Sequence, residues 1–218
     1  MNKKTLFIVA LAALLVVFGC GTLFYYAMNE NQVAPLPEVK QATLIRMHSP
    51  TLGKVDAPVV IVEFFDPACE TCAAFYPRVK EIMAANPDKI RLVLRYAPFH
   101  KGSDKVVALL EAARKQGKFW PVLEALLATQ ADWAPHHTPQ LSLVWKHLEG
   151  LGLNLEKVRA DMAAPEIANV IAQDVEDARI LNVTKTPEFF VNGRPLPSFG
   201  FEQLKKLIDA ALNENRRG

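Results

Sequence analysis

The apolar residues of this chain form one long uncharged run, followed by short runs separated by polar turns. Residues 5–28 carry no charge and directly follow Lys3 and Lys4. As a helix, this run would be roughly 36 Å long, enough to cross a hydrocarbon core of about 30 Å. Lysines before the run, and none just after it, predict a cytoplasmic N-terminus and an exported remainder. We therefore expect residues 1–28 to be a membrane anchor or signal segment.

Three fates are open for this segment. An uncleaved anchor is favoured by the pair Tyr25–Tyr26, because aromatic side chains prefer the headgroup level of a bilayer. The stretch Val17-Phe18-Gly19-Cys20 is similar to a bacterial lipobox, which would make Cys20 a lipidated N-terminus, and cleavage with secretion is the third possibility. The proline-containing residues 29–50 predict a tether to the exported domain.

The pattern of the exported part predicts the order β-α-β, then a helical block, then β-β-α. Val59–Phe65 is rich in β-branched and aromatic residues and predicts a buried strand, which leads into a helix at 69–85. Further strands are expected near 42–47, at 89–96 and at 188–191, with a hairpin turn at Asn192-Gly193. The other helices are expected at 104–116, 119–129, 139–150, from Asn154 onward, 165–181 and 201–213.

Two cysteines stand where the buried strand gives way to its helix. Cys69 would lie at the helix N-terminus, where unpaired N–H groups and the helix dipole favour thiolate over thiol. Cys72 lies one turn deeper, close enough to form a disulfide with it. Such a short loop removes little unfolded-chain entropy, so a redox role is favoured over a structural crosslink. Strand, helix and Cys-x-x-Cys in this order are typical of a thioredoxin-like redox site.

A single carboxylate interrupts the apolar strand before the cysteines. Glu63 stands six positions before Cys69, and burial there would raise its pKa unless a partner compensates. A half-exposed position or a lysine partner is the alternative for Glu63. A second local signal is Thr186-Pro187 ahead of a strand-like run, where a rigid turn is expected.

These features together resemble the DsbA-like periplasmic thiol-disulfide oxidoreductases. The resemblance rests on the Phe-x-x-x-x-Cys-x-x-Cys stretch, on the Thr-Pro before Glu-Phe-Phe-Val-Asn-Gly, and on the position of the helical block. It covers roughly residues 49–212. It implies an α/β, thioredoxin-like fold over residues 51–218, with a helical insertion at about 103–181 and an N-terminal transmembrane helix ahead of it.

The resemblance also implies roles for site residues. Cys69 would form a mixed disulfide with a client protein, and Cys72 would resolve it. Glu63 would carry a proton to or from Cys72. Pro187 would be cis and lie beside the cysteine pair, and the backbone at Thr186 would pair with an extended client segment. Thiolate attack on a disulfide needs no cofactor.

Two departures from the family pattern leave the direction of electron flow open. Glu70 and Thr71 occupy the places where strongly oxidising members have Pro-His, and a carboxylate beside Cys69 opposes thiolate formation. Thr186 before the proline resembles the isomerase branch. These residues predict a pair that is less oxidising than the strongest oxidases.

The function expected from these features is disulfide exchange with client proteins that carry thiols or disulfides. The catalytic domain would face the periplasmic side of a bacterial inner membrane, and a membrane redox partner would reset the cysteines. The alternatives are an isomerase or reductase kept reduced by such a partner, and a copper(I)-handling or chaperone module. In the chaperone reading, Trp120, Trp133 and Trp145 would line a client groove.

Other classes of function find less support in the sequence. No histidine pair has the spacing of a zinc finger, and His136-His137 is expected in a solvated turn, so no metal is expected. The 25 Lys and Arg residues are dispersed and nearly balanced by 23 Asp and Glu, which does not indicate nucleic-acid binding. The short tether leaves no room for a dimerisation domain and favours a monomer.

Overall fold

The computed structural model describes residues 2, 14–16, 18–22 and 44–215, which belong to two units, one within residues 1–37 and one within 38–218. In the first unit, residues 14–16 and 18–22 are helical, and Cys20 is an exposed free thiol. Within the described parts of the chain, no helix is long and apolar enough to cross a membrane. Most of the expected anchor at 5–28, and residues 29–43 of the expected tether, lie outside the described residues.

The second unit is built on a five-stranded sheet with the order β1-β3-β2-β4-β5. The central pair, β2 and β3, is parallel, and the other neighbours are antiparallel. The strands are β1 (Thr51–Leu52), β2 (Val59–Phe65), β3 (Ile90–Tyr96), β4 (Glu188–Val191) and β5 (Arg194–Pro195). Every residue of β2 is buried, as its uninterrupted apolar run predicts for a central strand covered on both faces.

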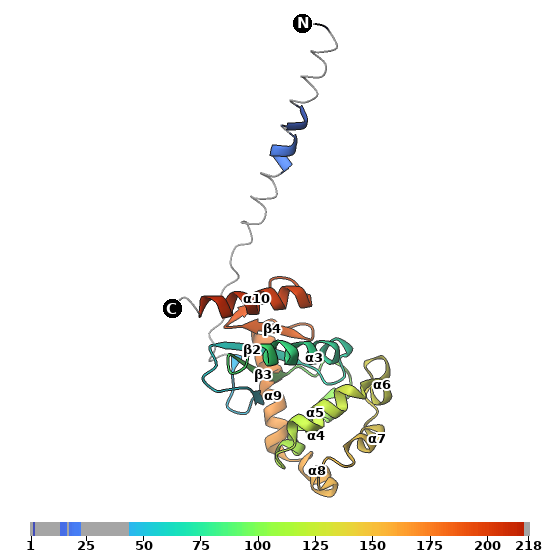
Figure 1. Cartoon of the computed structure of the whole chain (residues 1–218). Helices are drawn as coiled ribbons and strands as arrows, with labels where there is room; N and C mark the ends of the chain where they lie inside the picture. The colour runs from blue at the N-terminus through green and yellow to red at the C-terminus, as the bar shows by residue number, and fades with distance from the viewer. Residues whose placement is uncertain (1, 3–13, 17, 23–43, 216–218) are drawn as a thin grey trace. The chain divides into compact units, whose positions relative to one another are not determined.

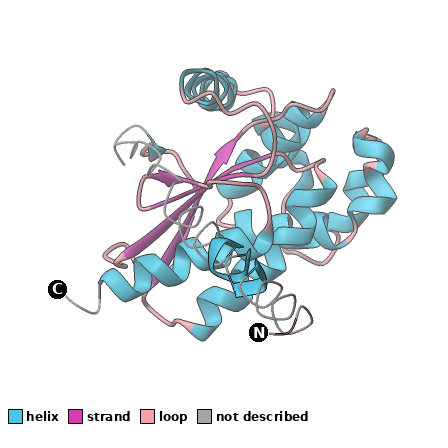
Figure 2. Ribbon diagram, turned by 90° about the horizontal axis from the view of Figure 1, so that it is seen from above, coloured by secondary structure: helices cyan, strands magenta, loops and turns pink. Residues whose placement is uncertain are grey.

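Helices cover both faces of this sheet (Figures 1 and 2). The face of β2 that carries Val59 and Ile61 packs against α3, α10 and the helical block, and the opposite face packs against the end of α9 around Ala178. The helices are α3 (Glu70–Ala85), α4 (Ser103–Arg114), α5 (Phe119–Ala128), α6 (Gln130–Trp133), α7 (Leu141–Val144), α8 (Leu155–Asp161), α9 (Pro165–Ile180) and α10 (Phe201–Glu214), with 3-10 turns η1 (Pro135–His137) and η2 (Trp145–Leu148).

The predicted order of elements is confirmed, with three local differences. The strand expected near 42–47 is wrong for residues 44–47, and the edge strand is the short β1 instead. The helix expected at 139–150 is divided into α7 and η2. The four-residue helix α6 was not predicted. Asn154 is an N-cap as expected, since its side chain accepts a hydrogen bond from the Lys157 N–H.

A cluster of charged residues explains why residues 44–47 do not extend the sheet. We call Arg46, His48, Arg95, Asp174 and Asp177 the arginine–aspartate cluster. The Arg95 guanidinium of β3 is fully buried and bonds both aspartates of α9, at 2.9 Å from its Nε to Asp174 Oδ1. Arg46 donates to both oxygens of Asp177, and His48 lies 2.6 Å from Asp174. These contacts fasten residues 44–50, expected in the tether, against β3 and α9.

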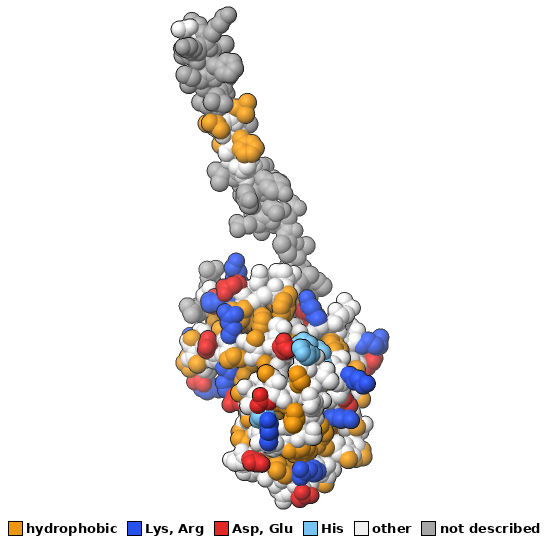
Figure 3. Space-filling model, turned by 90° about the vertical axis from the view of Figure 1, so that its right-hand side faces the viewer, with side chains coloured by type: hydrophobic (Ala, Val, Ile, Leu, Met, Phe, Trp, Pro, Cys, Tyr) orange, Lys and Arg blue, Asp and Glu red, His pale blue; other side chains and the backbone are white. Residues whose placement is uncertain are grey.

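Basic side chains are spread over the surface. On the face drawn in Figure 3, the Lys and Arg side chains of the described residues alternate with Asp and Glu and with apolar groups. Several of them form surface ion pairs, for example Lys80–Glu124 and Lys157–Asp161, both at 2.9 Å. Exposed pairs of this kind contribute little to stability.

Candidate active site

The first cysteine is the residue that begins helix α3. Cys69 is its N-cap, with an extended backbone, and its sulfur accepts a hydrogen bond from the Cys72 N–H at 3.4 Å. Its thiol also lies 3.3 Å from the Thr186 carbonyl oxygen, to which it can donate. The N-terminal helix position gives this sulfur unpaired N–H groups and the positive end of the helix dipole. A negative charge on Cys69 is therefore stabilised.

The two thiols are chemically different. Hydrogen bonding from the Cys72 side chain is the main reason why the pKa of Cys69 falls to about 5 against the opposing effect of burial. The Thr186 side chain and the backbone of Cys72 and Thr71 lower this pKa further. Burial raises the pKa of Cys72 well above its ordinary value, and the neighbouring Cys69 and Glu63 raise it further. Both cysteines are free thiols here, and both are buried. At neutral pH the site therefore pairs a thiolate at Cys69 with a protonated thiol at Cys72.

The predicted burial of Glu63 is confirmed. Glu63 is 1% exposed and lies in the middle of β2, where it is paired with Leu94 of β3 on one side and Phe189 of β4 on the other. Its Oε2 atom has no hydrogen-bond partner among the described residues. Burial first, and then the negative charge at Cys69, raise the pKa of Glu63 to about 8. A carboxyl group with this pKa can both accept and donate a proton near neutral pH.

The loop before β4 closes the other side of the site. The peptide bond between Thr186 and Pro187 is cis, as the resemblance implies. The contact between the Cys69 thiol and the Thr186 carbonyl brings this loop to the reactive sulfur, although 117 residues separate the two in sequence. Between the cysteines, Glu70 is exposed and Thr71 is half-buried, so both lie at the surface beside Cys69.

Five further residues form hydrogen bonds in or around the segment that precedes Cys69, and the sequence did not predict them as site residues. They are Asp66, His100, Ser103, Gln130 and His137, and all of them contact one another or the backbone of residues 66–69. Asp66 stands beside the cysteine motif and is the one member that the sequence could have indicated. The others come from distant segments and carry no motif of their own. His136 is exposed, as expected of a solvated turn, whereas His137 is half-buried.

An aromatic group lies next to the loop of Thr186 and Pro187. Phe75 of α3 stacks on Phe189 of β4, with ring centroids 5.7 Å apart, and also contacts Phe199 at 5.5 Å. Phe199 is 45% exposed, and the Lys185 ammonium lies 5.3 Å from its ring centre. A partly exposed apolar surface therefore adjoins the cysteine site.

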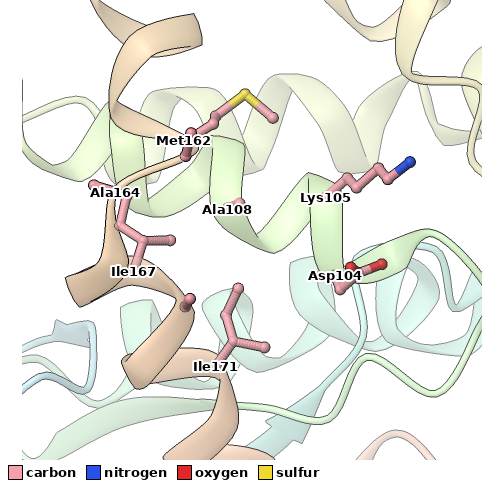
Figure 4. Close-up of a pocket in the computed structure, with 9 residues that line it drawn as sticks. Asp104, Lys105, Ala108, Met162, Ala164, Ile167 and Ile171 are labelled. Carbon is pink, nitrogen blue, oxygen red and sulfur yellow. The ribbon is translucent and has the colours of Figure 1, made fainter.

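Neither of two hollows in the described part of the chain is lined by a cysteine. One, of about 270 Å³, lies between α4 and α9 and is lined by Ala108, Met162, Ile167 and Ile171 among others (Figure 4). The other, of about 460 Å³, is lined by Tyr76, Lys80 and Glu124 among others. Among the described residues, no group of three or more His, Cys, Asp or Glu side chains could hold a metal ion.

The three tryptophans of the helical block do not form one exposed surface. Trp133 is fully buried, and its indole N–H donates to the Leu126 carbonyl at 2.8 Å. Trp120 and Trp145 are half-buried and pack against the core. The client groove of the chaperone alternative therefore lacks one of its three tryptophans.

The sequence is similar to the thioredoxin family over residues 46–210. A curated relative from Bacillus cereus, named probable disulfide bond formation protein D, is 30% identical over 94% of this chain and 94% of its own length. A Na(+)/H(+) antiporter NhaA of Salinispora tropica is 35% identical over 65% of this chain. The chain spans only 21% of the length of that antiporter.

A solved structure agrees with these sequence matches. The crystal structure of a thioredoxin-like oxidoreductase from Silicibacter pomeroyi is 31% identical and superimposes with a TM-score of 0.69. The match covers 80% of this chain and 99% of that one. The similarity therefore extends over most of the chain rather than over the cysteine motif alone.

Proposed function

The chain belongs to the thioredoxin family, among its DsbA-like thiol-disulfide oxidoreductases, and from this premise we propose that it exchanges disulfides with client proteins through Cys69 and Cys72. The observation that carries the proposal is the difference in pKa between the two thiols. Cys69, with a pKa of about 5, is a thiolate at neutral pH, whereas the pKa of Cys72 is raised well above its ordinary value. The thiolate is the form that attacks a disulfide.

Each direction of exchange uses the same two steps. When the protein is reduced, the Cys69 thiolate attacks a client disulfide and releases one client thiolate. Cys72 then loses its proton and attacks the Cys69 sulfur, which closes the Cys69–Cys72 disulfide and releases the second client thiolate. When the protein is oxidised, a client thiolate attacks Cys69, Cys72 leaves and takes up a proton, and a second client thiolate displaces Cys69.

Glu63 is the group that exchanges this proton with Cys72. Its pKa of about 8 lies near the working range of a proton carrier, and its charge raises the pKa of Cys72. Its Oε2 has no competing partner in the described structure. An unpaired buried carboxyl group beside a reactive thiol is typical of a functional group rather than a structural one.

Client segments are proposed to bind at the loop of Thr186 and Pro187. The Thr186 carbonyl lies at the Cys69 sulfur, so a client cysteine that reacts there would pass along this backbone. Extended segments bind exposed backbone through main-chain hydrogen bonds, and neighbouring apolar groups add affinity. The exposed ring of Phe199 and the Lys185 ammonium offer such an apolar and basic surface.

The physiological direction is proposed to be disulfide donation. Stabilising the Cys69 thiolate stabilises the reduced protein, and this makes its disulfide a better oxidant. The Bacillus cereus relative, named as a probable disulfide bond formation protein, supports the same direction. Thr186 and Glu70 favour the second candidate, an isomerase or reductase kept reduced by a membrane partner. A reduction potential near about −120 mV would support donation, and one of roughly −200 mV or lower the second candidate.

The protein is further proposed to act outside the cytoplasm, held at the membrane by residues 1–28. The uncharged residues 5–28 after two lysines support this position. Tethering would raise the effective concentration of the domain near a membrane redox partner. Recovery in the membrane fraction after a high-salt wash is expected, and recovery as soluble protein would contradict the anchor.

The exchange itself is tested by trapping. In a Cys72→Ser variant the mixed disulfide at Cys69 cannot be resolved, so client proteins should appear as adducts that reductant removes. The Cys69→Ser variant is the matched control and should form none. Absence of adducts from the Cys72→Ser variant, in cells where the protein is expressed and folded, would contradict disulfide exchange with clients.

A further inference from the structure

The segment from Asp66 to Cys69 joins β2 to α3 and presents the reactive sulfur. Side chains of the helical block bond several of its backbone atoms, in addition to two backbone hydrogen bonds, from Cys69 N–H to the Asp66 carbonyl and from Ala73 N–H to the Cys69 carbonyl. The carbonyl oxygens of Pro67, Ala68 and Cys69 all lie within hydrogen-bond distance of such a side chain. The insertion therefore holds the approach to Cys69 from outside the thioredoxin core.

The Asp66 carboxylate is the first anchor of this arrangement. It is fully buried and accepts hydrogen bonds from the Ala68 N–H at 2.8 Å and from the His100 N–H at 2.9 Å. The His100 ring nitrogen Nδ1 lies 2.8 Å from the same carboxylate, and the Ser103 hydroxyl donates to it. Three donors and the His100 ring nitrogen at one carboxyl group link the segment before Cys69 to the start of α4.

Gln130 of α6 is the second anchor. It is 5% exposed, and its amide nitrogen donates to the Pro67 carbonyl at 2.7 Å and to the Cys69 carbonyl at 3.1 Å. No other side chain in the described structure is bonded to both of these carbonyl groups. A buried amide aimed at two backbone acceptors fixes their relative position, because removing it would leave a buried carbonyl without its donor.

The two histidines complete the contact between the insertion and the segment. His137 Nδ1 lies 3.2 Å from the Ala68 carbonyl oxygen, and its ring stacks on that of His100 with centroids 4.6 Å apart. His136 and His137 both have positive φ, at 50° and 58°. Two consecutive non-glycine residues rarely adopt this conformation, and their strain persists only where surrounding contacts hold it.

We infer that Asp66 and Gln130 are positioning residues through which the helical insertion sets the reduction potential of the Cys69–Cys72 pair. The inference rests on the proposed function, since it concerns the same two thiols. Neither residue touches the reacting sulfur through its side chain. Each acts on the backbone that aims Cys69 at the N-terminus of α3.

The physical link is the stabilisation of the thiolate. The Cys69 sulfur accepts from the Cys72 N–H over 3.4 Å, a contact that depends on the angle at which the segment enters the helix. The backbone of Asp66 also acts on Cys72, whose pKa it lowers against the larger effect of burial. Only the reduced form carries the thiolate. Loosening the segment should therefore destabilise the reduced form more than the oxidised form, and should make the pair more reducing.

The test makes the same change, from glutamine to methionine, in two separate variants. Gln130→Met removes the amide at nearly constant volume and leaves Cys69 and Cys72 in place. Gln116→Met is the matched control, because Gln116 also bonds backbone, at the N–H and the carbonyl of Asn154, but contacts no residue of the site. The full-length protein is equilibrated with a glutathione series, and ultraviolet absorbance of the thiolate is titrated with pH.

The expected result is an equilibrium constant shifted about tenfold toward the oxidised protein in Gln130→Met, equal to about 30 mV for this two-electron couple, with a raised Cys69 pKa. Gln116→Met should match the wild type. Asp66→Asn, which keeps an acceptor for the Ala68 N–H but loses its charge, should shift the constant in the same direction. It is also the variant to use if Gln130→Met does not fold.

An unchanged potential in either folded variant would overturn the inference. Equal loss of unfolding stability in the oxidised and reduced forms would overturn it as well, because it would show a structural role alone. Failure of the wild-type protein to exchange with glutathione would instead contradict the proposed function. The two failures are therefore distinguishable.

Discussion

A buried acid lies at each face of the sheet, one on strand β2 and one on helix α9, and their surroundings shift their pKa values in opposite directions. Glu63 faces α3 with an unpartnered Oε2, and burial raises its pKa to about 8. Asp177 of α9 lies at the opposite face of the sheet. Burial alone would raise its pKa, but hydrogen bonds from Arg46 and Arg95 hold this pKa below its usual value. Pairing, rather than burial, decides which of the two is charged at neutral pH.

The comparison separates a structural acid from a functional one. In the arginine–aspartate cluster the positive charges pair with the negative ones, and the contacts of the cluster fasten residues 44–50 to β3 and α9. No cation among the described residues is paired with Glu63, so its protonation state can change when the charge on the cysteines changes. An acid of the first kind should matter for stability, and one of the second kind for the rate of exchange.

The largest effect is expected on stability, from Arg95→Met. This variant leaves Asp174 and Asp177 buried without their main cation, and such a loss typically costs about 3–5 kcal/mol of unfolding free energy. Arg179→Met, on the exposed side of the same helix α9, is the control and should change stability by less than about 0.5 kcal/mol. Urea unfolding checks both. A folded Arg95→Met protein of wild-type stability would show that the cluster is not structural.

The next largest effect is expected from Glu63→Gln, on the rate at which a mixed disulfide is resolved. The glutamine resembles the protonated acid but cannot take the Cys72 proton, so resolution of a mixed disulfide should slow by at least about tenfold. In the wild type, the resolution rate should rise with pH as Glu63 ionises through the pKa that burial raises, and this inflection should vanish in the variant. Stopped-flow kinetics with a model peptide disulfide measures it.

The matched control for this rate is Glu111→Gln. Glu111 is also buried, but its carboxylate is paired with the Tyr96 hydroxyl and with Arg114. Its variant should lose stability and keep the resolution rate. Equal slowing in both variants would mean that any buried carboxyl group affects the kinetics through the fold.

The same pKa makes a prediction about stability and pH in the oxidised protein. Burial raises the folded-state pKa of Glu63 above its ordinary value of 4.5, and it does so without a charge on Cys69. Its contribution to stability is therefore complete below 4.5 and is lost as pH rises through the raised pKa. Glu63→Gln should flatten this decline. Unfolding curves of the two oxidised proteins, recorded across that range, check the sign. A wild-type stability that rises with pH more steeply than that of the variant would contradict the assignment.

The smallest effect is expected from Thr71→His. A histidine cation one residue before Cys72 would add positive charge near the Cys69 thiolate, lower its pKa further and make the pair more oxidising. At a surface position the shift in the glutathione equilibrium should stay below about tenfold. Thr71→Asn, which adds no charge, should leave the equilibrium unchanged, and an equal shift in both variants would exclude an electrostatic cause.

Much of the fold could be predicted because its signals are local. The run Val59–Phe65 is apolar enough to predict a central strand, and the Cys-x-x-Cys after it predicts where the helix begins. The burial of Glu63 follows from the same run. Thr186-Pro187 required more than local pattern, since only the resemblance placed it beside cysteines that are more than a hundred residues away.

The remaining parts depend on contacts that no local pattern encodes. The alternation of charged and apolar residues at 89–96 predicts a strand but not the burial of Arg95, which is fully buried because two aspartates of α9, 79 and 82 residues away, bond it. Gln130 and His137 reach the cysteine loop in the same way, from more than sixty residues away. Such pairings arise from how helices pack, and the identity of a single glutamine or histidine does not indicate them.

The central claim is that two neighbouring thiols differ in acidity because Cys69 accepts hydrogen bonds at the start of a helix, whereas Cys72 is buried within it. The most direct measurement is the rate of alkylation of the reduced protein as a function of pH, with the modified residue identified by mass spectrometry. The account predicts that Cys69 alone is modified and that its rate follows a pKa of about 5, while Cys72 stays unmodified through neutral pH. Equal modification of both cysteines, or a rate at Cys69 that follows the ordinary thiol pKa of about 8.5, would contradict it.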